Sequence, residues 1–188
     1  TLPDLEGLNI NILGRNMTLV NTYVSGEHIS LEFVSGEVED ALYELDERNY
    51  DIGGTNYNVK VLNIDNSGPH TVTFEINGEI LPPLSNGEST ILQDGTLIAV
   101  MRLMALIDRV EFALDAEIFT VQDTDTSDTS WYNGVVIDND HIENAMVKII
   151  ANNAAVTSEI SSIKYRLSAQ SMDGVDIWVE PGHGVREY

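Results

Sequence analysis

Alternation of apolar and polar residues is the dominant pattern along this chain. Short alternating segments are separated by turns rich in Gly, Asn and Asp. A period of two is typical of β-strands that bury one face. The segments with this pattern are residues 16–24, 28–34, 55–64, 72–76, 110–121, 145–151, 161–170 and 174–182. The sequence therefore predicts an all-β fold, with sandwich-like or barrel-like domains built from short antiparallel strands.

One segment, Val38–Leu45, has apolar residues at the spacing of an amphipathic helix. An apparent internal repeat argues against that helix. The sequence from Ile29 aligns with the sequence from Val72, and Gly36, Leu42, Gly54 and Val59 match Gly78, Leu84, Gly95 and Val100 in turn. The second copy has Pro82-Pro83 where the helix would lie, and a proline inside a helix costs about 3 kcal/mol. We therefore predict strands in both copies.

The repeat has a period of about 42 residues, with units at about 29–64 and 72–105. Gly36 and Gly78 are expected to supply the positive φ of a tight turn, as are Gly87 and Gly95. By the same alignment the apolar run Leu97–Leu106 is predicted to be a strand. The polar loop 122–134 suggests a division into an N-terminal β domain, 1–121, that contains both repeat units, and a C-terminal β domain, 122–188.

Charge is the strongest compositional signal. The chain has 31 acidic residues against 9 basic ones, which gives a net charge of −22. This balance argues against nucleic-acid binding, which needs Lys and Arg to meet phosphate. The excess fits a solvated acidic surface, adaptation to high salt, or a surface that collects divalent cations.

No apolar run has the roughly 20 residues of a membrane span. No signal peptide is recognisable, and because the sequence begins without Met, we expect a mature or excised piece of a larger protein.

The acidic loop 123–128 is the best candidate for a metal site. Asp123, Asp125 and Asp128 alternate there, and alternating carboxylates in a flexible loop suit Ca²⁺, which takes six to eight oxygen ligands. The loop lacks the glycine and the distal glutamate of an EF-hand, so a solvated acidic loop is the alternative. The absence of cysteine excludes disulfides and thiolate chemistry.

Other candidate chemistry is sparse. The four histidines, His28, His70, His141 and His183, fall in no metal or nucleophile motif, and no phosphate loop or nucleophile elbow occurs. Aromatic residues could line a sugar-binding face, although packing in a core or an interface is the competing interpretation; they are Trp131, Trp178, Tyr132, Tyr165 and Tyr188. Asn16 begins a sequon for N-glycosylation, Asn16-Met17-Thr18.

An ordered series of turns gives a family resemblance. The matching residues are Phe74–Glu79, Leu84, Gly87-Glu88, Asp94-Gly95-Thr96 and Val110–Ala116. With the segments around them, from about Asn11 to Tyr188, they resemble surface-layer-type proteins of archaea, particularly those of small-genome lineages. Two features depart from that pattern: Asp115 stands where a glycine is usual, and the run after Gly95 is unusually apolar. The resemblance implies an external, self-associating structural protein, with Ca²⁺ and glycans as accompanying features.

We therefore expect a non-enzymatic structural protein of the cell surface. It would assemble with copies of itself into an S-layer-like lattice or an extracellular filament through contacts between β domains, bridged by divalent cations. The alternative is an adhesin or carbohydrate-binding module that uses Trp131, Trp178 and the loop Asp123–Asp128. An enzyme is disfavoured because no set of nucleophile and base can be assembled from the sequence.

Overall fold

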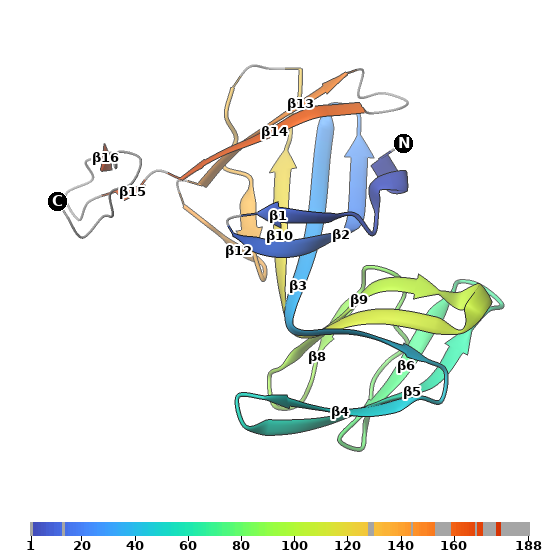
Figure 1. The fold of residues 1–188 in the computed structure, drawn as a ribbon. Coiled ribbons are helices and arrows are strands. Elements are labelled where there is room, and N and C mark those ends of the chain that lie inside the picture. Colours follow the sequence, from blue (N-terminus) through green and yellow to red (C-terminus); the bar gives the residue numbers. More distant parts are fainter. Residues whose placement is uncertain are drawn as a thin grey trace. The chain divides into compact units, whose positions relative to one another are not determined.

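The structure is a computed structural model that describes residues 2–12, 14–127, 130–143, 145–152, 159–167, 169–170 and 176–177. Most of these residues lie in β-strands, which confirms the predicted all-β class (Figure 1). The elements in chain order are η1 (Leu2–Leu5), β1 (Asn9–Ile12), β2 (Arg15–Ser25), β3 (His28–Tyr43), β4 (Glu47–Ile52), β5 (Thr55–Asp65), β6 (Thr71–Ile76), β7 (Glu79–Ile80), β8 (Ser89–Ile91), β9 (Leu97–Met104), η2 (Ala105–Ile107), β10 (Arg109–Asp123), β11 (Val135–Ile137), β12 (Asp140–His141), β13 (Ala145–Asn152), β14 (Glu159–Leu167), β15 (Ala169–Gln170) and β16 (Asp176–Ile177).

The strands form four sheets. An eight-stranded sheet has the order β1-β2-β3-β10-β11-β12, with β9 paired to β10 and β8 paired to β9. A four-stranded sheet has the order β4-β5-β6-β7, and two hairpins, β13-β14 and β15-β16, form sheets of two strands each. Every pair whose register is described is antiparallel. This topology fits the predicted antiparallel sandwich-like or barrel-like architecture.

Contacts within the chain define two units. The first comprises residues 1–2, 23–30 and 120–188, and the second comprises residues 3–22 and 31–119. The boundary between them falls inside η1, β2, β3 and β10, so each of these elements has residues in both units. The division expected from the sequence, 1–121 and 122–188, cuts the chain at a single point and stays a prediction.

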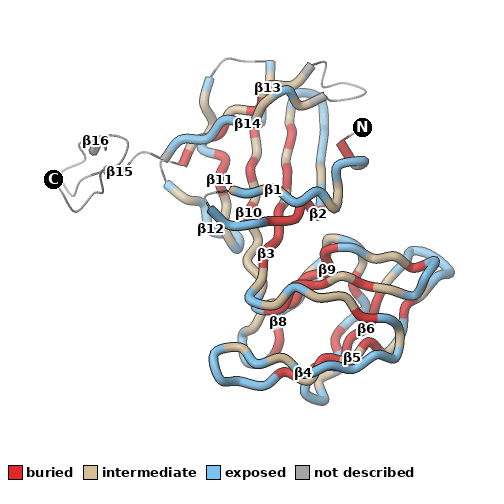
Figure 2. Tube along the Cα trace, viewed as in Figure 1, coloured by how far each residue is buried: buried red, intermediate tan, exposed pale blue. Residues whose placement is uncertain are grey.

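The second unit has its main core between two sheets. The four-stranded sheet covers one side, and β9, β10 and the last part of β3 cover the other. Phe112 lies at the centre, with its ring centroid 5.6 Å from that of Phe74 and 6.0 Å from that of Tyr50. Fully burying such a side chain contributes roughly 1.5–3 kcal/mol. The buried positions alternate with half-buried ones along β6 and most of β5, as the sequence predicts (Figure 2).

β9 is buried on both faces. Ile98 and Val100 point into the main core, whereas Ala99 and Met101 belong to a smaller cluster with Val20, Val34 and Ala113. A strand with two buried faces needs no polar alternation. This explains why the run after Gly95 is so apolar, and it confirms the prediction of a strand rather than a helix. Val38–Leu45 is also not helical, because β3 extends to Tyr43.

β3 and β10 each change the face that they bury. In β3 the buried positions are odd-numbered up to Phe33, but the core-facing positions from Val38 onward are even-numbered. In β10 the positions that face the main core are even-numbered, Val110 to Leu114, and the buried positions from Phe119 onward are odd-numbered. Asp115 lies at the change in β10 and has a left-handed backbone, with φ of 52°. Aspartate tolerates this region better than most residues, and glycine occupies it most easily.

Gly36 does not form the turn that the sequence predicts. It lies inside β3, and its φ is not among the positive values of the chain, whereas Gly78, Gly87 and Gly95 do have the positive φ expected of them. A Cβ at Gly36 would lie 2.9 Å from Ala113 Cβ and 2.9 Å from the Leu114 carbonyl oxygen. Gly36 is therefore required by the close approach of β3 to β10 rather than by a turn.

The structure does not confirm the internal repeat. The matched residues Gly54 and Gly95 both have positive φ before a strand, and the matched Val59 and Val100 are both buried. The first halves of the proposed units differ, however, because β3 continues unbroken through Gly36 while the chain turns back at Gly78 between β6 and β7. The alignment of the two proposed units thus matches turns that are alike, but the two units do not share one fold.

We predict that Gly36→Ala lowers the free energy of unfolding by about 1–3 kcal/mol, because the added methyl group must displace backbone and Cβ atoms that cannot easily move. Glu37→Ala is the matched control, since Glu37 is exposed on the same strand and its truncation should change stability by less than about 0.5 kcal/mol. Urea denaturation of both variants measures the difference. Equal stability of the two variants would show that β3 and β10 have room at this point.

Candidate functional site

Asp123, the first residue of the predicted metal loop, is buried at the end of β10. Its side chain accepts a hydrogen bond of 2.8 Å from the Ile149 backbone N–H and one of 3.1 Å from the Asp125 N–H. Only 1% of Asp123 is exposed. The carboxylate therefore ties the end of β10 to β13, and both of its oxygens already serve as acceptors.

The rest of the loop is held by similar local bonds. Asp125 Oδ1 accepts from the Ser127 N–H at 3.1 Å and from the Ser127 hydroxyl at 2.5 Å. Thr126 donates from its N–H to the Glu27 carbonyl oxygen at 3.0 Å, which fixes the loop to the β2–β3 turn. Asp128 lies outside the described residues. Within the described part of the chain no group of three His, Asp or Glu side chains is arranged to hold a metal ion. A Ca²⁺ site formed by Asp123, Asp125 and Asp128 stays a prediction.

The predicted glycosylation residue, Asn16, is exposed near the start of β2. Its Oδ1 accepts a hydrogen bond of 3.2 Å from Asn11 Nδ2 on the neighbouring strand β1. Thr18, the third residue of the sequon, is buried and donates its hydroxyl to Asn9 Oδ1 at 2.6 Å. The asparagine is thus accessible, while the threonine takes part in pairing β1 with β2. Glycosylation itself stays a prediction.

Three of the aromatic residues proposed for sugar binding, Trp131, Tyr132 and Tyr165, lie within the described residues. The guanidinium carbon of Arg166 lies 4.8 Å from the ring centroid of Trp131 and covers one face of the indole. Tyr132 pairs its backbone with Val147, and Tyr165 is exposed on β14. Trp178 and Tyr188 lie outside the described residues, as does His183. Cation–π contact with Arg166 is a sufficient role for Trp131.

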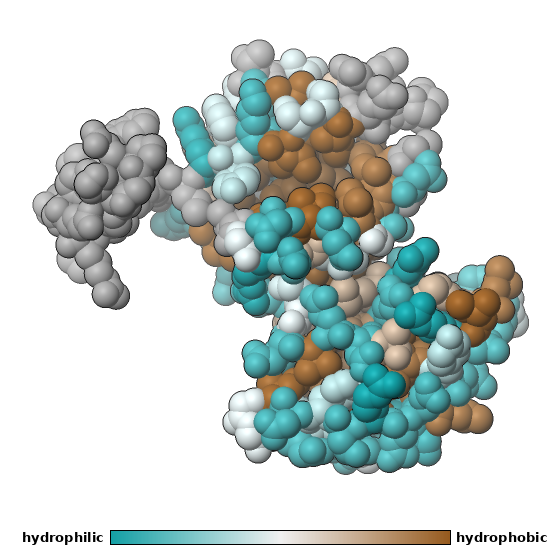
Figure 3. Space-filling model, viewed as in Figure 1, coloured by the Kyte–Doolittle hydropathy of each residue, from teal (hydrophilic) through white to brown (hydrophobic). Residues whose placement is uncertain are grey.

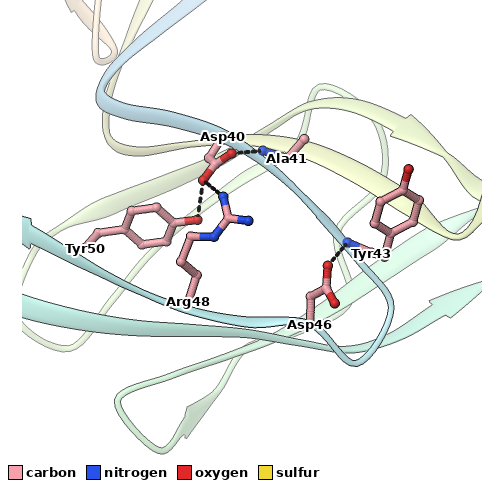
Figure 4. Close-up of polar contacts among 6 residues, drawn as sticks. All are labelled: Asp40, Ala41, Tyr43, Asp46, Arg48 and Tyr50. Carbon is pink, nitrogen blue, oxygen red and sulfur yellow. Dashed lines mark hydrogen bonds and ion pairs between the residues drawn. The ribbon is translucent and has the colours of Figure 1, made fainter.

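A polar cluster that the sequence did not indicate connects the two sheets of the second unit (Figure 4). Asp40 on β3 accepts hydrogen bonds from the Tyr50 hydroxyl at 2.8 Å and from the Ala41 N–H at 2.7 Å, and it forms an ion pair with Arg48. Arg48 and Tyr50 belong to β4, which lies in the other sheet. Asp46, in the turn between the two strands, accepts from the Tyr43 N–H at 3.0 Å. The cluster joins β3 to β4 where no backbone ladder does.

The electrostatics of the cluster suit a structural tie. Burial alone would raise the pKa of Asp40, but the hydrogen bonds from Ala41, Tyr50 and Arg48 and the charge of Arg48 together lower it. The pKa of Tyr50 is raised, first by burial and then by its hydrogen bond to Asp40. The hydroxyl therefore stays protonated and acts as a donor. The pKa of Arg48 is raised by its bond to Asp40, so the pair remains ionised at neutral pH.

Two sequence features could have pointed to this cluster. Arg48 and Tyr50 are two residues apart, so a strand places them on one face, and Asp40 is the nearest acidic residue on the inward face of the preceding strand. The sequence assigned no function to these residues because 31 carboxylates leave every base with several possible partners.

Known proteins offer no further assignment. Comparison with protein-family models, with curated proteins and with solved structures finds no match. No helix in the described ranges is both long enough and apolar enough to cross a membrane. The function must therefore be argued from the described residues and their arrangement.

We predict that Asp123→Ala lowers the free energy of unfolding by about 1–3 kcal/mol, because it leaves the buried Ile149 N–H without an acceptor. Asp123→Asn keeps an acceptor oxygen and should cost less. Hydrogen exchange at the Ile149 amide, measured by NMR, should accelerate strongly in the alanine variant alone. If both variants exchange like the wild type, the hydrogen bond to Asp123 does not protect this amide.

The Asp40 cluster predicts a dependence of stability on pH. Because folding lowers the pKa of Asp40 below its ordinary value of 3.8, the stabilisation is complete above that value. It is lost as the pH falls through the lowered pKa of the folded state. In Asp40→Asn, and in Arg48→Gln, the free energy of unfolding should fall less steeply with acid than in the wild type. Urea denaturation at a series of acidic pH values measures this, and parallel curves would refute the assignment.

Proposed function

We propose that this chain is a structural protein of a cell surface that associates with copies of itself. The observation that carries the proposal is the presence of open sheet edges. β4 ends the four-stranded sheet and β14 ends the β13–β14 sheet, and neither has a second strand partner among the described residues. Edges of this kind are natural sites for joining one β protein to another.

The polar clusters support a structural role. Asp40 with Arg48 and Tyr50 connects two sheets, and Asp123 connects β10 to β13. Each group in these clusters takes its polar partner from the protein itself. Ionisable groups that are satisfied in this way stabilise the fold, whereas a reaction needs groups that are free to exchange protons or bind a substrate.

Charge is the second support for the proposal. With a net charge of −22, copies of the chain repel each other in dilute buffer. Hydrophilic residues dominate the visible face around β4 (Figure 3). Divalent cations or high salt would reduce this repulsion and allow close contact.

An external location, with Ca²⁺ and glycans as accompanying features, follows from the resemblance to archaeal surface-layer proteins and belongs to the same proposal. The adhesin alternative stays a prediction, because Trp178 lies outside the described residues and Arg166 covers one face of Trp131.

We expect the average mass of the wild-type protein in solution to rise with concentration, and to rise further when Ca²⁺ is added. Sedimentation velocity over a range of concentrations, with Ca²⁺ and with a chelator, measures the mass, and negative-stain electron microscopy reports the form of the assemblies. Monovalent salt at matched ionic strength is the control that separates screening from bridging by Ca²⁺. A monomer indifferent to concentration, salt and Ca²⁺ would overturn the proposal.

A further inference from the structure

The β13–β14 hairpin concentrates positive charge in a chain that has little of it. Three of the nine basic residues of the chain, Lys148, Lys164 and Arg166, lie on these two strands. The register places Lys148 directly opposite Lys164, with Arg166 next to them on the same face. Lys164 and Arg166 are exposed on β14, and opposite charges on neighbouring strands attract each other.

The opposite face of the hairpin is apolar and only partly covered. On β13, Val147 and Ile149 are buried almost completely, whereas their cross-strand partners on β14 are not. Ile163 is 36% exposed and Tyr165 is 51% exposed. β14 thus carries an apolar row on one face and a basic row on the other, and its outer edge has no strand partner within the described residues.

β4 has the complementary pattern. Glu47, Asn49 and Asp51 are exposed on one face, while Tyr50 and Ile52 on the other face pack against the main core. β4 is also an open edge, since its only described strand partner is β5. The other edges are short or lack acidic charge: β1 carries no charged residue, and β7, β8 and β12 have two or three residues each.

We infer that β14 of one molecule pairs with β4 of a second copy of this chain. Both strands alternate with a period of two, so one pairing places Lys164 and Arg166 on the same face as Glu47 and Asp51. The same pairing places Ile163 and Tyr165 beside Tyr50 and Ile52. Because the two edges differ, the contact is heterologous, and it propagates into an open chain of molecules instead of closing as a dimer. The inference rests on the proposed function and names the contact through which it would operate.

The absence of native cysteine allows a direct test by cross-linking. Ser162 lies on the face of β14 that carries Lys164, and Asn49 lies on the acidic face of β4. A disulfide forms only when two Cα atoms are within about 7 Å. We expect mixed Ser162→Cys and Asn49→Cys proteins to form a disulfide-linked heterodimer under mild oxidation. The control is Asn11→Cys on the open edge strand β1, mixed with Ser162→Cys, which should not cross-link.

Charge reversal gives an independent measurement. Lys164→Glu should weaken self-association about tenfold, as expected for an interfacial charge pair turned repulsive. The variant leaves the contact between Arg166 and Trp131 intact, and circular dichroism checks that it is folded. The double variant Glu47→Lys/Asp51→Lys should restore association when it is mixed with Lys164→Glu.

The outcomes separate this inference from the proposed function. If the wild type assembles but Ser162→Cys cross-links to itself or to Asn11→Cys instead of Asn49→Cys, the inference is wrong and the proposed function stands. The inference is also wrong, and the proposed function also stands, if Lys164→Glu assembles as well as the wild type. If the wild type stays monomeric and none of the pairs cross-links, both are overturned.

Discussion

The close approach of β3 and β10 at Gly36 is the constraint on which the second unit depends. A side chain at this position would collide with Ala113 Cβ and with the Leu114 carbonyl oxygen. Near the same point both strands change the face that they bury. The missing side chain lets the two backbones lie together where each strand turns from one core to another. The main core around Phe112 and the smaller cluster around Ala113 then lie on opposite faces of β10.

Polar side chains connect strands that are not joined by backbone hydrogen bonds of a sheet. β3 and β4 belong to different sheets, and Asp40, Arg48 and Tyr50 connect them. Asp123 makes a comparable connection from β10 to β13 through the Ile149 N–H. Each tie uses a carboxylate, the most abundant polar group of the chain. Part of the acidic composition therefore has a structural use, beside the larger part that gives the surface its negative charge.

The class of the fold could be predicted from the sequence because alternation is a local property. Pro82-Pro83 correctly argued against a helix, and Leu97–Leu106 was correctly expected to contain a strand. The role of Gly36 could not be predicted, because a glycine needed for close approach has the same local sequence as a glycine in a turn. The repeat failed for the same reason. Spacing matched the turns, but the long-range pairing of β3 with β10 decided the structure of the first unit of that repeat.

The candidate site was harder to predict than the fold. Alternating aspartates at 123 and 125 predict metal ligands, and that site stays a prediction. The structure adds that both carboxylates accept hydrogen bonds from backbone N–H groups, which the sequence did not indicate. The cluster at Asp40 could not be predicted, because its members come from two sheets and the local sequence does not determine how those sheets pack. The exposed edges of β4 and β14 were likewise invisible, since an edge is defined by the absence of a neighbouring strand.

The boundary between the two units has a mechanical consequence. β2, β3 and β10 each have residues in both units. Hydrogen bonds in antiparallel sheets run perpendicular to the strands, so tension along these strands would load the rows of bonds in shear, and many bonds would have to break together. In the edge-to-edge assembly that we propose, a pull along one of these strands would therefore meet the combined resistance of its whole row of hydrogen bonds.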